Sequence, residues 1–274
     1  MKTVLKLIIL TSLFFISTSY IYANDSKRNL VDIAKDQRIL SQKIAKSYLL
    51  LAYGANMQEI RTELKTSIFL FENNLDILRV QTPNHFSKVA SDIILKEALV
   101  WQDLKVNVKK APNKDNLNRI VELANGLLRK SHLAYIAFRT ELEVATNYSI
   151  DTNLDNLLKI SEKQEILSQR LCLYFVAQKI NITAEKHNPK ILGTLRSIVE
   201  KLDRQLIVLL DTNVNSSETR RIIDNALIAF EDIRTNKTDF LDGKPSMNTI
   251  YTTTKQLNKL FKILATEYSQ LAST

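Results

Sequence analysis

The sequence contains very few residues that break helices or cross-link a chain. Its 274 residues include only 4 Gly, 4 Pro and 1 Cys. So few turn-forming residues do not suit the many tight turns of a β-rich fold, and they favour long helices. The single cysteine, Cys172, excludes an intrachain disulfide, so stability must come from packing. It lies between Leu171 and Leu173 on a predicted helix, where we expect a buried and unreactive thiol.

Signatures of catalysis and metal binding are also missing. The three histidines, His85, His132 and His187, are far apart, and none has a metal-ligand partner three or four residues away. The sequence has no Gly-rich phosphate loop and no G-x-S-x-G motif. The large aromatics Trp101 and Phe230 are interpreted as core residues. We therefore expect no enzyme activity, no cofactor and no metal site.

Residues 1–23 have the composition of an export signal. Lys2 and Lys6 precede an apolar run, 7–16, and small and polar residues then lead to Ala23. This order is typical of a secretory signal peptide and predicts cleavage after Ala23 and a periplasmic location. The alternative is an uncleaved segment that anchors the protein to the inner membrane. The apolar run is shorter than the ~20 residues of a full span, and no later segment is apolar enough to span.

The net charge favours acidic partners. The chain carries +9, and removal of residues 1–23, which hold two lysines and no acids, leaves +7. Such an excess suits anionic ligands or an anionic membrane surface. The basic residues are scattered and do not form a run with interleaved aromatics. Together with the export signal, this pattern argues against nucleic acid as a partner.

An internal repeat is the most informative feature. Residues 29–44 read NLVDIAKDQRILSQKI, and residues 156–171 read NLLKISEKQEILSQRL, at an offset of 127. Residues 98–105 and 226–234 resemble each other in the same order if one residue is inserted, which sets Trp101 opposite Phe230. Two matching blocks in one order indicate a duplicated module. We therefore divide the chain into a signal peptide, 1–23, a first module, 24–148, and a second module, 149–274.

Each module is predicted to be an antiparallel four-helix bundle. Apolar residues recur at spacings of three and four, and short connections between long helices make neighbours antiparallel. Helices of the first module are expected to be interrupted at Gly54, Pro83 and 111–113. Those of the second module are expected to be interrupted at 188–189 and 242–245. The link 146–151 has no Pro or Gly, so the fourth and fifth helices could merge into one long helix and the bundles could stack end to end. The predicted helices are 26–53, 56–80, 86–110, 115–147, 152–182, 188–212, 217–240 and 247–272.

The repeated element places polar side chains on an apolar helix face. Gln37 falls within the apolar stripe, with Ser41 near it and Arg38 and Gln42 on its flank. One interpretation is a polar packing layer that fixes the helix register, because a buried amide needs partners. The other is a small-ligand site, in which the fork of Arg38 and the donors of Ser41 and Gln42 bind an oxyanion. The matching residues of the second module are Gln164, Ser168 and Gln169.

At these residues the sequence resembles a known family. The segment 34–46, AKDQRILSQKIAK, is similar to the A-G-R-Q-R-M-L-S-Q-R-x-A-K pattern of the type IV pili methyl-accepting chemotaxis transducer N-terminal domain. That domain is a relative of the periplasmic domain of nitrate and nitrite sensor kinases. This chain departs from the pattern at Lys35, Asp36 and Ile39. The second module has Glu165 in the place of Arg38, so we expect any anion site in the first module.

The resemblance implies a periplasmic helical bundle, in tandem as in pilus-type transducers, that senses for a membrane-bound signalling module. In the nitrate sensors, the arginine that matches Arg38 binds the anion at a dimer interface. The resemblance therefore implies a small anionic ligand, a membrane receptor or signalling protein as partner, and a homodimer. The alternative is a structural or adhesive periplasmic protein that binds no small molecule.

Overall fold

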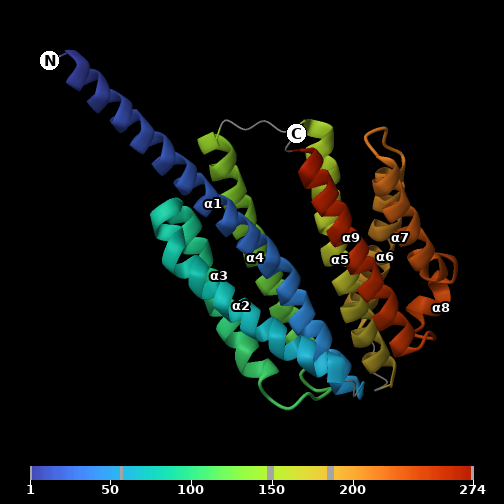
Figure 1. Ribbon diagram of the computed structural model, residues 1–274. Helices are drawn as coiled ribbons and strands as arrows, with labels where there is room; N and C mark the ends of the chain where they lie inside the picture. Colours follow the sequence, from blue (N-terminus) through green and yellow to red (C-terminus); the bar gives the residue numbers. More distant parts are fainter. Residues whose placement is uncertain (1, 56–57, 147–150, 184–187, 273–274) are drawn as a thin grey trace.

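The protein is all-α within the part of the chain that the structure describes. The computed structural model describes the backbone of residues 2–55, 58–146, 151–183 and 188–272, and side chains from residue 25 onward. These residues contain nine helices and no strand (Figure 1). The helices are α1 (Lys2–Tyr53), α2 (Gln58–His85), α3 (Lys88–Val108), α4 (Leu117–Thr146), α5 (Thr152–Thr183), α6 (Pro189–Leu210), α7 (Ser217–Thr235), α8 (Lys237–Leu241) and α9 (Met247–Leu271).

Most of the predicted helix ends are confirmed, and each has a local cause. Gly54 ends α1 with a φ of 102°, a left-handed conformation that glycine adopts without strain. Asn188 caps α6 through its side chain, and Pro189 takes the first helical position. Ser216 and Ser246 cap α7 and α9, where each side chain accepts a hydrogen bond from the backbone N–H three residues later.

Three boundary predictions were wrong. Pro83 does not end the second helix, because α2 continues through it to His85. The first helix begins at Lys2 and not at residue 26, so the segment assigned to the signal peptide is continuous with α1. The helix predicted over 217–240 is interrupted at Asn236, which separates α7 from the short α8.

The first four helices pack around one apolar core. Helix α1 lies against α2 and α4, and α3 lies against α4 and α2. Trp101 of α3 contacts Phe71 of α2, with 4.5 Å between ring centroids. Phe86 stacks on Phe138 of α4 at 4.3 Å. Trp101 is 4 % exposed, as expected for a core aromatic.

The remaining helices form a second packed group. Helix α5 lies against α6 and α9, and α7 lies against α6, α8 and α9. Phe175 of α5 stacks on Phe240 of α8, with 4.9 Å between ring centroids. Phe230 and Cys172 are fully buried, as predicted, and burial raises the pKa of the Cys172 thiol to about 11.

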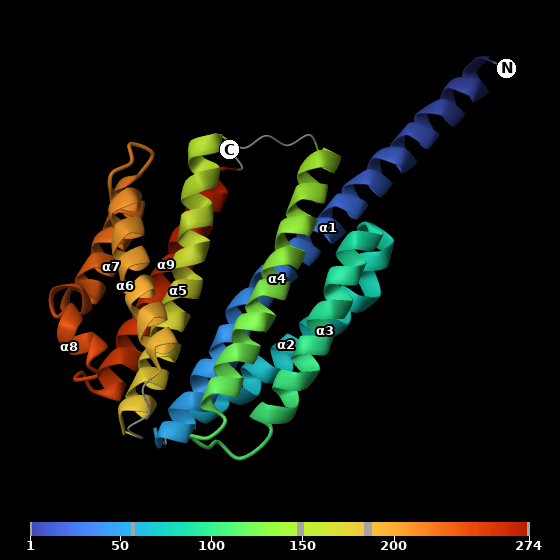
Figure 2. The same cartoon turned by 180° about the vertical axis from the view of Figure 1, so that it is seen from behind.

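The two groups lie side by side and not end to end. Helix α4 ends at Thr146 and α5 begins at Thr152, and the two helices stand next to each other in Figures 1 and 2. Asn125 of α4 forms a hydrogen bond with Tyr174 of α5, and Tyr135 of α4 forms one with Glu162 of α5. Residues later in α4 therefore contact residues earlier in α5. The two helices are therefore antiparallel neighbours. The expectation that they merge into one long helix was wrong, because α4 and α5 run in opposite directions.

Helix α1 is the helix of the first group that packs most closely on α5. Arg38 of α1 contacts Glu162 of α5, and Lys46 of α1 contacts Gln169 of α5. Residues later in α1 contact residues later in α5, so the two helices run parallel. We call this contact the α1–α5 seam. Its partners are 124 and 123 residues apart, close to the 127-residue offset of the repeat. The two repeated elements therefore face each other across the seam.

Candidate functional site

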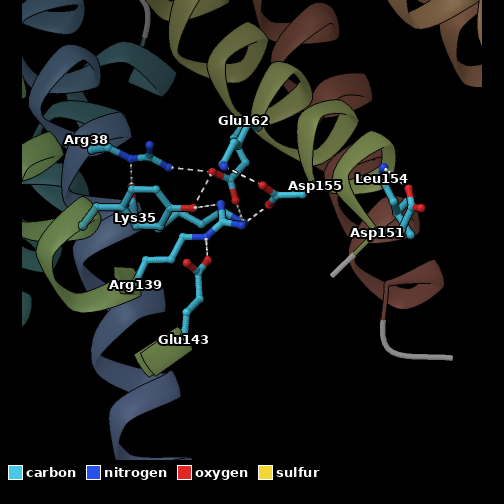
Figure 3. A network of polar contacts seen from close by, with 10 residues as sticks. Lys35, Arg38, Arg139, Glu143, Asp151, Leu154, Asp155 and Glu162 are labelled. Carbon is cyan, nitrogen blue, oxygen red and sulfur yellow. Dashed lines mark hydrogen bonds and ion pairs between the residues drawn. The ribbon is translucent and has the colours of Figure 1, made fainter. Parts of the chain in front are cut away.

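A buried carboxylate at the α1–α5 seam brings three side chains together. The Glu162 Oε2 atom accepts hydrogen bonds from Arg38 Nη2 at 3.0 Å and from the Tyr135 hydroxyl at 2.9 Å. Its Oε1 atom pairs with Lys35 Nζ at 3.1 Å. Figure 3 shows Lys35 and Arg38 converging on Glu162 from α1. The carboxylate thus lies where the sequence predicted a small anion beside Arg38.

The side chain of Arg38 is almost completely buried. Its side chain is 5 % exposed, and its guanidinium carbon lies 3.8 Å from the centroid of the Tyr135 ring. Its Nε atom donates to the Lys35 carbonyl at 3.4 Å. The cation that was expected to meet a ligand thus already has an anionic and an aromatic partner, both from the chain itself.

The environment keeps Glu162 ionised. Burial alone raises the pKa of a carboxyl, but the charges of Lys35 and Arg38 outweigh it and hold the pKa of Glu162 below its usual value. The pKa of Tyr135 is raised to about 12, first by burial and then by the charge of Glu162. The tyrosine therefore stays protonated and donates its hydrogen to the carboxylate.

Further charges extend this cluster towards the ends of α4 and α5. Arg139 of α4 pairs with Asp155 of α5 and, at 2.7 Å, with Glu143 (Figure 3). Burial tends to raise the pKa of Asp155, but hydrogen bonds from Lys159 and Arg139 lower it overall. The contacts of Glu162 and Asp155 together tie α1, α4 and α5 to one another.

The predicted residues Gln37 and Gln164 have matching structural roles. Both are fully buried, and each donates from Nε2 to a backbone carbonyl of the next helix in its own group. Gln37 bonds the Phe71 carbonyl of α2 at 3.2 Å, and Gln164 bonds the Leu202 carbonyl of α6 at 3.0 Å. These contacts match the packing-layer interpretation of the repeated element.

Ser41 and Ser168 also match each other. Each is fully buried and donates to a carbonyl three residues earlier, at 2.7 Å: Ser41 to Arg38 and Ser168 to Glu165. A hydroxyl that bonds its own helix needs no external partner. Neither serine therefore offers a free donor to a ligand at the seam.

Gln42 and Gln169 differ between the halves. Gln42 donates from Nε2 to the Ala124 carbonyl of α4 at 3.0 Å. Gln169 instead accepts a hydrogen bond from Lys46 Nζ, at 2.9 Å across the seam. Lys46 also pairs with Glu63 at 2.9 Å and is 3 % exposed. Of the predicted residues, Arg38 and Gln169 make contacts across the seam, whereas the hydrogen bonds of the others stay within their own helix group.

Glu165, the counterpart of Arg38, is buried with 4 % exposure. Among the described residues no basic group lies within ion-pair distance of its carboxylate. Burial raises its pKa to about 7, against the opposing charges of Lys35, Lys262 and Lys43. The two halves thus differ at this position, because Arg38 is ion-paired and Glu165 is not.

Lys35, Tyr135 and Glu162 were not predicted from the sequence as site residues. A signal for two of them was present, because Lys35 and Arg38 match Glu162 and Glu165 at the offset of 127. A pair of cations in one copy thus aligns in sequence with a pair of acids in the other, and both cations contact the first of these acids, Glu162. Only the parallel packing of α1 on α5 turns that correspondence into a contact, and Tyr135 has no comparable sequence signal.

No group of side chains suited to a metal ion occurs among the described residues. Within the described part of the chain no helix combines the length and the apolarity that a membrane span requires. The predicted cleavage after Ala23 stays a prediction, because the side chains around this site lie outside the described residues. Comparisons with protein-family models, with curated proteins and with solved structures give no match for this chain.

Proposed function

We propose that this chain is an exported, non-catalytic ligand-binding protein of the sensory type, built from two tandem four-helix modules paired within one chain. The observation that carries the proposal is the meeting of repeat-matched residues, Lys35 and Glu162, across the α1–α5 seam. Contacts between equivalent positions are expected when two copies of one module pair through the same helix. This is the kind of seam at which the resembled sensors bind their anion.

Because Glu162 already occupies the position beside Arg38, we expect the ligand to bind at another place in the molecule. A small anion could take the place of Glu162 at the Arg38 Nη2 atom only by displacing this carboxylate, which already has three partners. The paired copies also supply within one chain the interface for which the resemblance implied a homodimer. We propose that the protein reports ligand occupancy to a membrane-bound signalling partner in the periplasm.

The structural or adhesive alternative has one observation in its favour. Gln37, Ser41, Gln164 and Ser168 are fully buried and bond the protein backbone. Such contacts need no ligand, so the repeated element can be explained by packing alone. The alternative therefore predicts that no small molecule stabilises the folded protein.

A thermal-shift screen separates the two functions. A ligand that binds only the folded state raises the apparent melting temperature as its concentration rises. The purified mature protein is screened with inorganic oxyanions, small carboxylates, organic phosphates and their neutral analogues. We expect a saturable rise with at least one class of anion. Unchanged melting with every compound would support the structural alternative.

A further inference from the structure

A basic cavity is lined by side chains of α1, α4, α5 and α6. The helices α4, α5 and α6 face the viewer in Figure 2. Its volume is about 440 Å³, within the range typical of small-molecule sites. Seven arginine and lysine side chains line it, together with a single carboxylate, that of Glu162. This cavity could not be predicted from the sequence, because its cations come from four helices, α1, α4, α5 and α6.

Four of these cations lack a carboxylate partner. Arg38, Arg139 and Lys159 are paired with Glu162, Glu143 or Asp155. Among the described residues no ion pair is formed by the other four, which are Arg129, Lys163, Arg170 and Lys201. The Nε atom of Arg170 is buried and has no hydrogen-bond partner. A buried donor without a partner is costly, and an anionic group in the cavity would satisfy it.

The excess of cationic side chains makes the electrostatic potential in the cavity positive. His132 lines the cavity, and its pKa is lowered first by burial and then by the charges of Arg38 and Lys163. Like charges held together in a concave site focus their field and attract anions from solution. The lone carboxylate, Glu162, is already bound by Lys35 and Arg38 and offsets little of this charge.

The cavity also has apolar walls. Leu128, Ile136, Ile166 and Leu167 line it, and Ile136 is 42 % exposed. An inorganic ion would leave these surfaces uncovered, whereas an organic body would remove them from water. A second cavity of about 570 Å³ shares Leu128, Arg129 and Arg170 with the first and leaves room for a longer molecule.

We infer that this cavity binds a soluble organic anion that carries a phosphate, sulfonate or carboxylate on an apolar or aromatic body. The inference rests on the proposed ligand-binding function and names its ligand class. The acidic group contacts the unpaired cations Arg129, Lys163 and Arg170, and the apolar body lies on Ile136. The site therefore lies between the two modules and does not belong to the first one alone, in contrast to the expectation from Arg38 and Glu165.

Calorimetric titration with phenyl phosphate, inorganic phosphate and phenol tests the ligand class. Phenyl phosphate is expected to bind more tightly than either of its parts, and its binding should weaken as salt is added. In the double variant Arg129→Gln/Lys163→Gln the Kd should rise by about tenfold. The control Lys65→Gln/Lys259→Gln makes the same charge change at exposed sites outside the cavity and should bind like the wild type.

A second pair of variants tests the apolar wall. Ile136→Ser should weaken phenyl phosphate and leave inorganic phosphate unchanged, whereas Ile228→Ser, on the exposed face of α7, should alter neither. If an anion binds the double variant Arg129→Gln/Lys163→Gln as tightly as it binds the wild type, this site is overturned but the proposed function is kept. If no anion binds the wild type, both are overturned. Binding only to vesicles that contain phosphatidylglycerol would exclude a soluble ligand and assign the cations to a membrane surface.

Discussion

Glu162 holds a negative charge where its side chain is only 5 % exposed. Such a charge is tolerated because Lys35, Arg38 and Tyr135 all direct donors at it. Removal of one partner of a buried pair leaves the other charge uncompensated, which costs more than the pair itself contributes. The seam therefore behaves as a filled anion site whose anion is part of the chain.

Glu162→Ala should empty that site. We expect the free energy of unfolding to fall by about 3 kcal/mol, because Arg38 stays buried without a counter-ion. Formate should restore part of the loss in a saturable way, since its carboxylate can take the place beside Arg38 and Tyr135. Urea denaturation with and without formate measures both effects, with sodium chloride at equal ionic strength as the salt control.

The control for this experiment is Glu165→Ala, because Glu165 is equally buried but has no ion-pair partner among the described residues. Formate should not stabilise that variant more than it stabilises the wild type. Equal responses of the two variants to formate would mean that Glu162 does not occupy an anion site.

Glu97 of α3 presents the opposite case, a buried carboxyl with no cation beside it. Its Oε1 atom accepts a hydrogen bond from Ser131 at 2.5 Å, and its Oε2 atom has no partner. Burial raises its pKa from 4.5 to about 7. Between these values the folded state binds more protons than the unfolded state, so the contribution of Glu97 to stability falls as the pH rises.

Glu97→Gln removes this titration. Relative to wild type, the variant should gain about 2 kcal/mol of stability between about pH 5 and about pH 8. Urea denaturation at both pH values measures the change, and Glu267→Gln, at a partly exposed site on α9, serves as the control. A constant difference between variant and wild type would show that Glu97 is ionised throughout.

At the scale of the helices, the repeated element joins each first helix to the second helix of its group. Gln37 connects α1 to α2, and Gln164 connects α5 to α6, through equivalent hydrogen bonds. Gln37→Ala and Gln164→Ala should each lower the free energy of unfolding by about 2 kcal/mol, through a lost hydrogen bond and a cavity. Thermal denaturation measures the effect. The exposed Gln256→Ala on α9 should change little, and similar losses in all three variants would rule out a special role for the buried amides.

Helix positions could be predicted from the sequence because their causes are local. Gly54, Asn188 and Ser216 end or begin helices through their own backbone or side-chain chemistry. The prediction that the helix ends before Pro83 was wrong. Pro83 lies in the last turn of α2, where packing of the neighbouring residues Thr82 and Phe86 keeps the chain helical. The apolar stripe likewise identified the burial of Gln37.

The partners of the seam could not be predicted in the same way. Arg38, Tyr135 and Glu162 come from three helices, and their meeting depends on which face of α1 packs on α5. Sequence periodicity identifies a buried face but not the helix that covers it. The resemblance supplied Arg38 as an anion-binding residue and could not show that the chain provides its own carboxylate.

At the scale of the whole molecule, the seam joins the two helix groups into one unit. The pairs Arg38–Glu162 and Lys46–Gln169 are buried between the groups, and Arg139–Asp155 ties α4 to α5. Partial unfolding of either group would expose unpaired charges of the other. We therefore expect one cooperative unfolding transition, with equal calorimetric and van't Hoff enthalpies.

Differential scanning calorimetry tests this coupling. The double variant Glu162→Ala/Asp155→Ala removes the carboxylates that α1 and α4 share with α5, and its transition should broaden or divide into two. Glu218→Ala/Glu231→Ala removes two exposed acids of α7 and should keep a single transition. Two transitions in the wild type would show that the groups unfold independently.

The contact of Lys35 with Glu162 has a consequence for how such an interface can change. In a symmetric pair of identical chains, a residue on the two-fold axis faces its own copy, so two lysines there would repel each other. Within a duplicated chain the two sides are encoded separately, and one can become acidic while the other stays basic. When the two modules belong to one chain, the interface surface of each no longer has to be complementary to an identical copy of itself. An interface that would need a bound anion between identical subunits can then close on its own carboxylate, which leaves the rest of the molecule free to acquire a new ligand.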